Sequence, residues 1–132
     1  AGQRSHRARC TAGHSRLLAG EGLLVTEPLG YLDFVHLMAT ARAVITDSGG
    51  IQEETTVLGV PCLTVRDNTE RPATCTAGTN RLVGTRPEGL LGAWRDLAAA
   101  RPEPRRPPLW DGRAAERIVD VLAAWAAAGQ AR

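Results

Sequence analysis

Residues 44–54 read VITDSGGIQEE, in which a short β-branched run passes through two glycines into a helix-forming segment. Glycine lets a backbone approach a ligand closely, and the first N–H groups of a helix have no partner within it. The helix dipole adds partial positive charge at the same end. The stretch therefore predicts a strand, a turn and a helix whose start, at Ser48, Gly49 and Gly50, can hold a phosphate or a diphosphate.

Two side chains of this stretch suit a nucleotide. Ser48 can donate its hydroxyl to a phosphate oxygen, and Glu54, about one turn into the helix, can accept both hydroxyls of a ribose. The same residues also suit a purely structural helix start, because Ser48 is a good N-cap and Glu53 and Glu54 complement the dipole. Taken alone, the stretch favours this structural interpretation, and without a Gly-Lys-Ser/Thr sequence it is not a Walker P-loop.

On either side of this stretch, short apolar runs alternate with helical segments. Segment 31–42 is apolar on more than one face, so we expect it to be buried on most sides. The alternation predicts an α/β fold, a Rossmann-like, doubly wound parallel sheet of about four or five strands with helices on both faces. The predicted strands are 23–25, 43–46, 61–65 and 79–84, the predicted helices 31–42, 51–58, 88–99 and 111–128, the predicted loop 66–77 and the proline-rich link 101–108.

The 132 residues suit a single domain with its own core. Residues 1–20 carry several Arg, His and Gly residues and show no apolar period. We therefore predict an irregular or disordered N-terminal segment over residues 1–20. The domain itself is predicted over residues 21–132, as a partial Rossmann-like unit.

Composition excludes several classes of function. All 16 residues counted as Lys or Arg are Arg, so no lysine chemistry resides in this chain. A net charge of +2 is too small to argue for a nucleic-acid or membrane partner, and no apolar run approaches the roughly 18 residues of a membrane span. The 3 cysteines have neither a zinc spacing nor a disulfide framework. We expect a cytoplasmic protein without a metal or redox cofactor.

Several motifs in the same order resemble the non-hydrolysing UDP-N-acetylglucosamine 2-epimerases, over about residues 22 to 122. That resemblance implies the C-terminal half of a glycosyltransferase-B type fold, with a UDP-sugar held in the cleft between two domains. The implied reaction interconverts UDP-N-acetylglucosamine and UDP-N-acetylmannosamine, by elimination of UDP and re-addition with C2 inverted. The motifs are PLGYLDFVHLM (28–38), TDSGGIQEE (46–54), LGVPC (58–62), RDNTERP (66–72), AGTNRLVG (77–84) and WDGRAAERI (110–118).

The resemblance also implies roles for individual residues. Ser48, Gly49 and Gly50 would hold the diphosphate, and Glu54 the ribose hydroxyls. The backbone at Phe34 would meet the uracil. Arg71 would reach the phosphates or the sugar and, as the one catalytic residue implied here, stabilise the charge on departing UDP. A guanidinium suits that task because it can pair with a phosphate through two hydrogen bonds.

In the family, the carboxylates that move the C2 proton belong to the N-terminal domain, which we do not find in this sequence. We therefore expect a truncated C-terminal part, inactive by itself, that works in a homodimer or with a separately encoded N-terminal half. Residues 1–20 look unlike the family altogether.

Two other functions stay open. One is the nucleotide-sugar domain of a glycosyltransferase, against which the loop RDNTERP argues. The other is a non-catalytic fragment that binds UDP, or binds nothing. The expected pathway, for an active epimerase, is the supply of surface-polysaccharide precursors.

Overall fold

The computed structural model describes residues 22, 24–100 and 102–129. The chain divides into two compact units, residues 1–30 and 31–132. In the first unit, Gly22 and residues 24–30 form neither helix nor strand. The strand predicted at 23–25 is therefore wrong for Leu24 and Val25, which are 85% and 68% exposed. A β-strand needs a neighbouring strand with which to form backbone hydrogen bonds, and these two apolar residues have none in the described part of the chain. Leu23 and the predicted irregular segment 1–20 lie outside the described residues.

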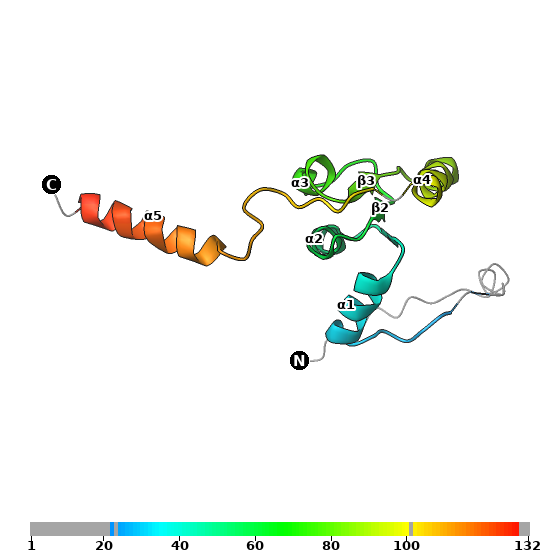
Figure 1. Cartoon of the computed structure of the whole chain (residues 1–132), viewed down its shortest axis with the longest axis horizontal. Helices are drawn as coiled ribbons and strands as arrows, with labels where there is room; N and C mark the ends of the chain where they lie inside the picture. Colours follow the sequence, from blue (N-terminus) through cyan, green and yellow to red (C-terminus); the bar gives the residue numbers. More distant parts are fainter. Residues whose placement is uncertain (1–21, 23, 101, 130–132) are drawn as a thin grey trace, which may run out of the picture. The chain divides into compact units, whose positions relative to one another are not determined.

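The second unit carries a three-stranded parallel sheet in the order β1-β2-β3. The described residues thus hold fewer strands than the four or five predicted, because Leu24 and Val25 are not in a strand. Each strand is added on the same side of the one before it. The change of side that defines a doubly wound sheet is therefore not present among these three strands. The elements, shown in Figure 1, are α1 Tyr31–Thr40, β1 Val44–Thr46, α2 Gly49–Leu58, β2 Cys62–Thr64, α3 Pro72–Thr76, β3 Asn80–Leu82, α4 Pro87–Ala99 and α5 Ala114–Gly129.

Helices α2 and α4 pack on opposite faces of this sheet. Neighbouring residues of a strand point to opposite faces, and Asn80 and Arg81 are neighbours in β3. Asn80 Nδ2 donates to Gln52 Oε1 of α2 at 3.0 Å, whereas Arg81 Nη1 lies 2.6 Å from Asp96 Oδ2 of α4. The prediction of helices on both faces of a parallel sheet is confirmed.

The core is small and unusually polar. Its buried apolar residues are Met38, Val60, Cys62, Leu63 and Ala93, and the buried polar ones are Gln52, Thr55, Thr56, Thr64, Thr74 and Asn80. Buried polar groups require hydrogen-bond partners, so this core is specified by side-chain pairing as much as by apolar contact.

Helix α1 corrects one prediction on burial. Met38 is its buried residue, while Leu32 is 80% and Leu37 54% exposed. Burial on most sides needs a second layer of structure over the helix, and α2 is the element against which α1 packs. The helix also ends two residues early, at Thr40, whose Oγ1 donates to the His36 and Leu37 carbonyl oxygens at 3.0 and 3.2 Å.

Three further boundaries differ from the prediction. Helix α2 begins at Gly49 rather than 51, while its predicted end before Gly59 is confirmed, since Gly59 has a left-handed φ of 71°. The predicted loop 66–77 contains the short helix α3, which Pro72 initiates at its first position. Helix α5 begins at Ala114 rather than 111, because Gly112 has a φ of 80°. Among the described residues, no helix is both long and apolar enough to cross a membrane.

Candidate functional site

Two loops meet at the carboxyl ends of β1 and β2. Because these strands are parallel, the turn at Ser48 and the loop 65–71 leave the same edge of the sheet. A Cβ atom built on Gly49 would lie 3.9 Å from Glu70 Oε2, so the loop after β2 reaches the start of α2. This edge is where ligands of open α/β sheets bind.

The start of α2 is open to a ligand. Ser48 is the N-cap residue, with extended backbone angles of −80° and 130°, but its side chain makes no capping hydrogen bond. Its N–H group donates to Thr46 Oγ1 at 3.0 Å instead. Ser48 and Gly50 are exposed. The Ser48 hydroxyl is therefore not used by capping and can meet a ligand, while the ligand-binding interpretation stays a prediction.

Arg71 stands beside the first turns of α2. Its Nε atom lies 2.9 Å from Glu53 Oε1, with both side chains nearly half exposed. Glu54, the next residue of α2, is half-buried. The structure thus brings Arg71 together with the helix that carries Ser48, Gly50 and Glu54. Sequence reasoning missed Glu53 as the partner that holds the guanidinium.

A second guanidinium lies in the same loop. Arg66 pairs with Glu70 through two contacts, Nη1 to Oε2 at 3.1 Å and Nη2 to Oε1 at 2.9 Å. This hydrogen bonding lowers the pKa of Glu70 below its ordinary value and raises that of Arg66. Glu70 is therefore ionised at neutral pH beside Gly49, where it competes with any bound anion for positive charge.

Phe34 lies inside α1, half-buried. It lines a cavity of about 230 Å³ together with Met38, Thr46 and Ile51. Thr46 ends β1, and Ile51 belongs to the first turn of α2. The predicted uracil residue therefore lies close to the turn that carries the predicted diphosphate residues, and its role stays a prediction.

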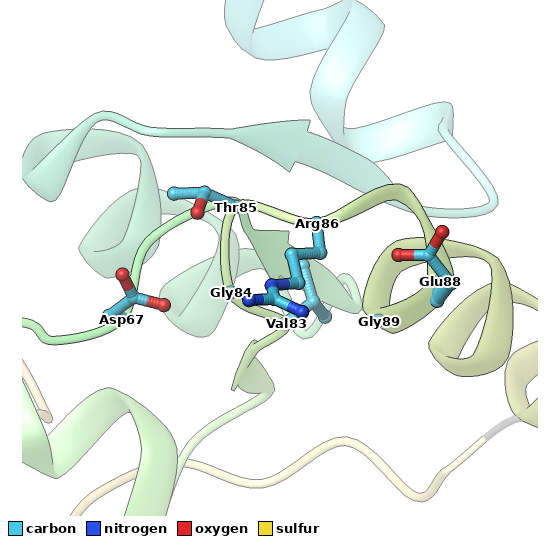
Figure 2. A pocket seen from close by; sticks show the side chains of 7 residues that line it. All are labelled: Asp67, Val83, Gly84, Thr85, Arg86, Glu88 and Gly89. Carbon is cyan, nitrogen blue, oxygen red and sulfur yellow. The ribbon is translucent and has the colours of Figure 1, made fainter.

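A larger hollow of about 660 Å³ lies at the carboxyl end of β3. Figure 2 shows its lining residues, with Arg86 between Asp67 and Glu88 in that view. Glu88 occupies the first turn of α4, and Pro87 removes one N–H group there. The start of α4 therefore offers an anion one N–H donor fewer than the start of α2 does, although Arg86 also lines the hollow.

A buried polar cluster under α2 was not predicted. Thr64 Oγ1 donates to Asn80 Oδ1 at 2.6 Å, and Asn80 Nδ2 donates to Gln52 Oε1 at 3.0 Å. These residues come from β2, β3 and α2. The first pair is separated by 16 positions in the sequence and the second by 28. Contacts between such distant residues leave no periodic pattern, so the sequence did not indicate this cluster.

Cys62 lies in β2, fully buried, and burial raises the pKa of its thiol. A neutral thiol in a closed core is a poor nucleophile, so Cys62 has no chemical role at the site.

The sequence model of one family, described as UDP-N-acetylglucosamine 2-epimerase, matches residues 4–123. The match begins well inside the segment 1–20 that was expected to look unlike this family. That expectation is therefore wrong from residue 4 onward, and the resemblance extends further toward the N-terminus than the motifs alone indicated.

Curated relatives have the same name. The chain is 42% identical over 107 residues to the UDP-N-acetylglucosamine 2-epimerase of Methanocaldococcus jannaschii, covering 81% of this chain and 29% of that protein. It is also 42% identical over 107 residues to the Escherichia coli K12 enzyme, covering 77% and 28%. The chain thus spans less than a third of the length of the relatives that it matches.

Solved structures agree. The UDP-GlcNAc 2-epimerase of Methanocaldococcus jannaschii, in complex with UDP-GlcNAc and UDP, matches with a TM-score of 0.71 and 41% identity, over 83% of this chain and 30% of that one. The Neisseria meningitidis enzyme bound to UDP-GlcNAc matches with a TM-score of 0.71 and 34% identity, over 84% and 32%.

Proposed function

The chain belongs to the UDP-N-acetylglucosamine 2-epimerase family, and we propose that it supplies the nucleotide-holding part of such an enzyme's active site. One observation supports this above the others. Within the described part of the chain, the Ser48 hydroxyl makes no capping hydrogen bond at the start of α2, and the guanidinium of Arg71 pairs with Glu53 of the same helix. Together these donors suit a diphosphate.

The proposed roles follow from position along α2. Ser48, Gly49 and Gly50 hold the diphosphate, since the helix dipole and N–H groups converge there. Glu54 lies about one turn further on and accepts the two ribose hydroxyls. Phe34, whose cavity reaches Ile51, contacts the uracil through its backbone.

Arg71 has the one catalytic role proposed for this chain. Elimination of UDP places negative charge on the departing diphosphate, and re-addition removes that charge. A guanidinium that follows this change in charge stabilises the departing group and therefore lowers the barrier in both directions. Because Glu53 is its partner in the structure, the phosphate replaces a carboxylate when UDP binds.

Movement of the C2 proton lies outside these roles. The resemblance assigns it to carboxylates of the other domain, and this chain spans 29% of its Methanocaldococcus relative. We therefore propose that residues 1–132 bind UDP without turnover by themselves, and that turnover needs the carboxylates of the other domain. The proposed setting is the cytoplasm, in the supply of surface-polysaccharide precursors.

A chimeric enzyme tests this function. The chain would replace the matching part of the Methanocaldococcus jannaschii enzyme, and the product would be assayed for interconversion of UDP-N-acetylglucosamine and UDP-N-acetylmannosamine. The proposal expects activity that Glu54→Ala strongly lowers and that Glu88→Ala, outside the site, preserves. A folded chimera that releases UDP only when a sugar acceptor is added would favour a glycosyltransferase instead.

A further inference from the structure

Gln52 is a buried amide between the phosphate-binding turn and Glu53. Its side chain is 0% exposed. Its oxygen, Oε1, accepts two hydrogen bonds, from Thr69 Oγ1 at 2.6 Å and from Asn80 Nδ2 at 3.0 Å. One atom thus joins α2 to the loop after β2 and to β3.

The first of these bonds continues to the N–H group of Arg71. The hydroxyl of Thr69, which donates to Gln52, accepts the Arg71 N–H group at 3.0 Å. The Thr69 oxygen therefore bridges the buried Gln52 amide and the backbone of Arg71, the residue proposed to contact phosphate. The direction of both hydrogen bonds is fixed, because the hydroxyl has one hydrogen and donates it to Gln52.

The second bond continues to the carbonyl group of Arg71. Asn80 Nδ2 also donates to Thr74 Oγ1 at 3.1 Å, and Thr74 Oγ1 donates to the Arg71 oxygen at 2.7 Å. Both backbone polar groups of Arg71 are therefore connected to Gln52 Oε1 by hydrogen bonds. The N–H group is connected through Thr69, and the carbonyl group through Thr74 and Asn80.

The Gln52 amide has a cost in stability. Its Nε2 group is buried and has no hydrogen-bond partner among the described residues. An unpaired buried donor destabilises a fold, whereas the oxygen of the same amide pairs with two donors, Thr69 Oγ1 and Asn80 Nδ2. The geometry of the oxygen therefore explains an amide at this position.

We propose that Gln52 is a positioning residue, which sets the place of the Arg71 backbone beside the start of α2. This inference rests on the proposed function, in which Arg71 contacts the phosphates of UDP. Gln52 itself touches no ligand. Its effect is indirect. The exposed Arg71 side chain is long, so its guanidinium is placed reproducibly beside the phosphates only when the Arg71 backbone is fixed.

The first test needs no ligand. The variant Gln52→Met keeps the length of the side chain and removes the acceptor. Its matched control is Thr56→Val, in the same helix, since Thr56 is 1% exposed and donates to the Gln52 carbonyl without a route to Arg71. Amide hydrogen exchange, followed by NMR in the free chain, should become about tenfold faster at Arg71 in Gln52→Met, and change less than about twofold there in Thr56→Val.

Thr69→Val provides the same test from a half-exposed position, should Gln52→Met fail to fold. It removes the bridge to the Arg71 N–H group and should speed exchange at Arg71 in the same way. Unchanged exchange at Arg71 in a folded Gln52→Met or Thr69→Val variant overturns the proposal.

The second test is a double-mutant cycle on UDP affinity, measured by calorimetry. Gln52→Met should weaken UDP binding about threefold to thirtyfold in the natural chain, and less than about twofold when Arg71→Ala is already present. Equal losses in both backgrounds would show a merely structural role and contradict the proposal. If the natural chain binds no UDP, the proposed function fails, while the exchange at Arg71 still decides whether Gln52 positions that residue.

Discussion

Arg71 Nε and Glu53 Oε1 lie 2.9 Å apart, so an ion pair joins the loop after β2 to the first turns of α2. Each side chain remains nearly half exposed, and an exposed pair of this kind contributes at most about 1 kcal/mol. The pair therefore shows where the guanidinium lies in the free chain, beside a helix start that suits an anion.

Neutralising Glu53 should strengthen UDP binding. A diphosphate has to displace Glu53 from Arg71, and the Glu53→Gln variant removes that competition. We expect UDP to bind up to about fivefold more tightly, the factor that corresponds to an exposed ion pair of about 1 kcal/mol. Calorimetry at constant ionic strength measures this. Weaker binding would mean that Glu53 orients Arg71 rather than competing for it.

Removing Glu54 should matter most for nucleotides with a complete ribose. Hydrogen bonds to a carboxylate contribute roughly 1.5–3 kcal/mol, so Glu54→Ala should weaken UDP binding about tenfold to a hundredfold. The same variant should lose less affinity for 2′-deoxy-UDP, which lacks one of the two hydroxyls. Glu88→Ala, on α4, is the control and should leave both affinities unchanged. Equal losses for the two nucleotides would remove Glu54 from the ribose site.

Two glycines of α4 should respond in opposite ways to alanine. A Cβ atom at Gly89 would lie 2.1 Å from the Val83 oxygen, whereas one at Gly92 would meet nothing within 4 Å. Gly89→Ala should therefore lower the free energy of unfolding by about 2 kcal/mol or more, since backbone has to move. Gly92→Ala should raise it by roughly 0.5–1 kcal/mol through helix propensity. Urea denaturation followed by circular dichroism measures both, and equal effects would contradict the packing of α4.

Asp111 should titrate unusually low. The guanidinium of Arg117, followed by the N–H group of Arg113, lowers the pKa of Asp111 from 3.8 to about 2. A lowered pKa means that this pairing stabilises the fold above about pH 3.8 and is lost as the pH falls through about 2. NMR titration should show the pKa return toward 3.8 in Arg117→Ala. Arg113→Ala keeps its backbone N–H group and should change it little.

Much of the fold follows from local pattern. The β-branched run at 44–46 and the glycines at 49 and 50 predict β1 and the start of α2, and Gly59 predicts its end. The pattern failed where partners decide the outcome. Leu24 and Val25 suit a strand by composition, but a strand needs a neighbour with which to pair.

The candidate site divides in the same way. Ser48, Gly49, Gly50 and Glu54 follow from one contiguous motif whose chemistry can be inferred from the residues. The hydrogen bond between Gln52 and Asn80 joins residues 28 positions apart, one in a helix and one in a strand. Neither segment has a sequence pattern that indicates the other. Only the packing of α2 on the sheet brings them together, so it could not be inferred before the structure.

The most direct test of the account is a calorimetric titration of the 132-residue chain with UDP, repeated with Arg71→Ala and Glu54→Ala. We expect binding at one site per chain, weakened about tenfold or more in each variant because each loses a charge-assisted hydrogen bond. Absence of binding by a chain that circular dichroism shows to be folded, or binding that neither variant weakens, would contradict it.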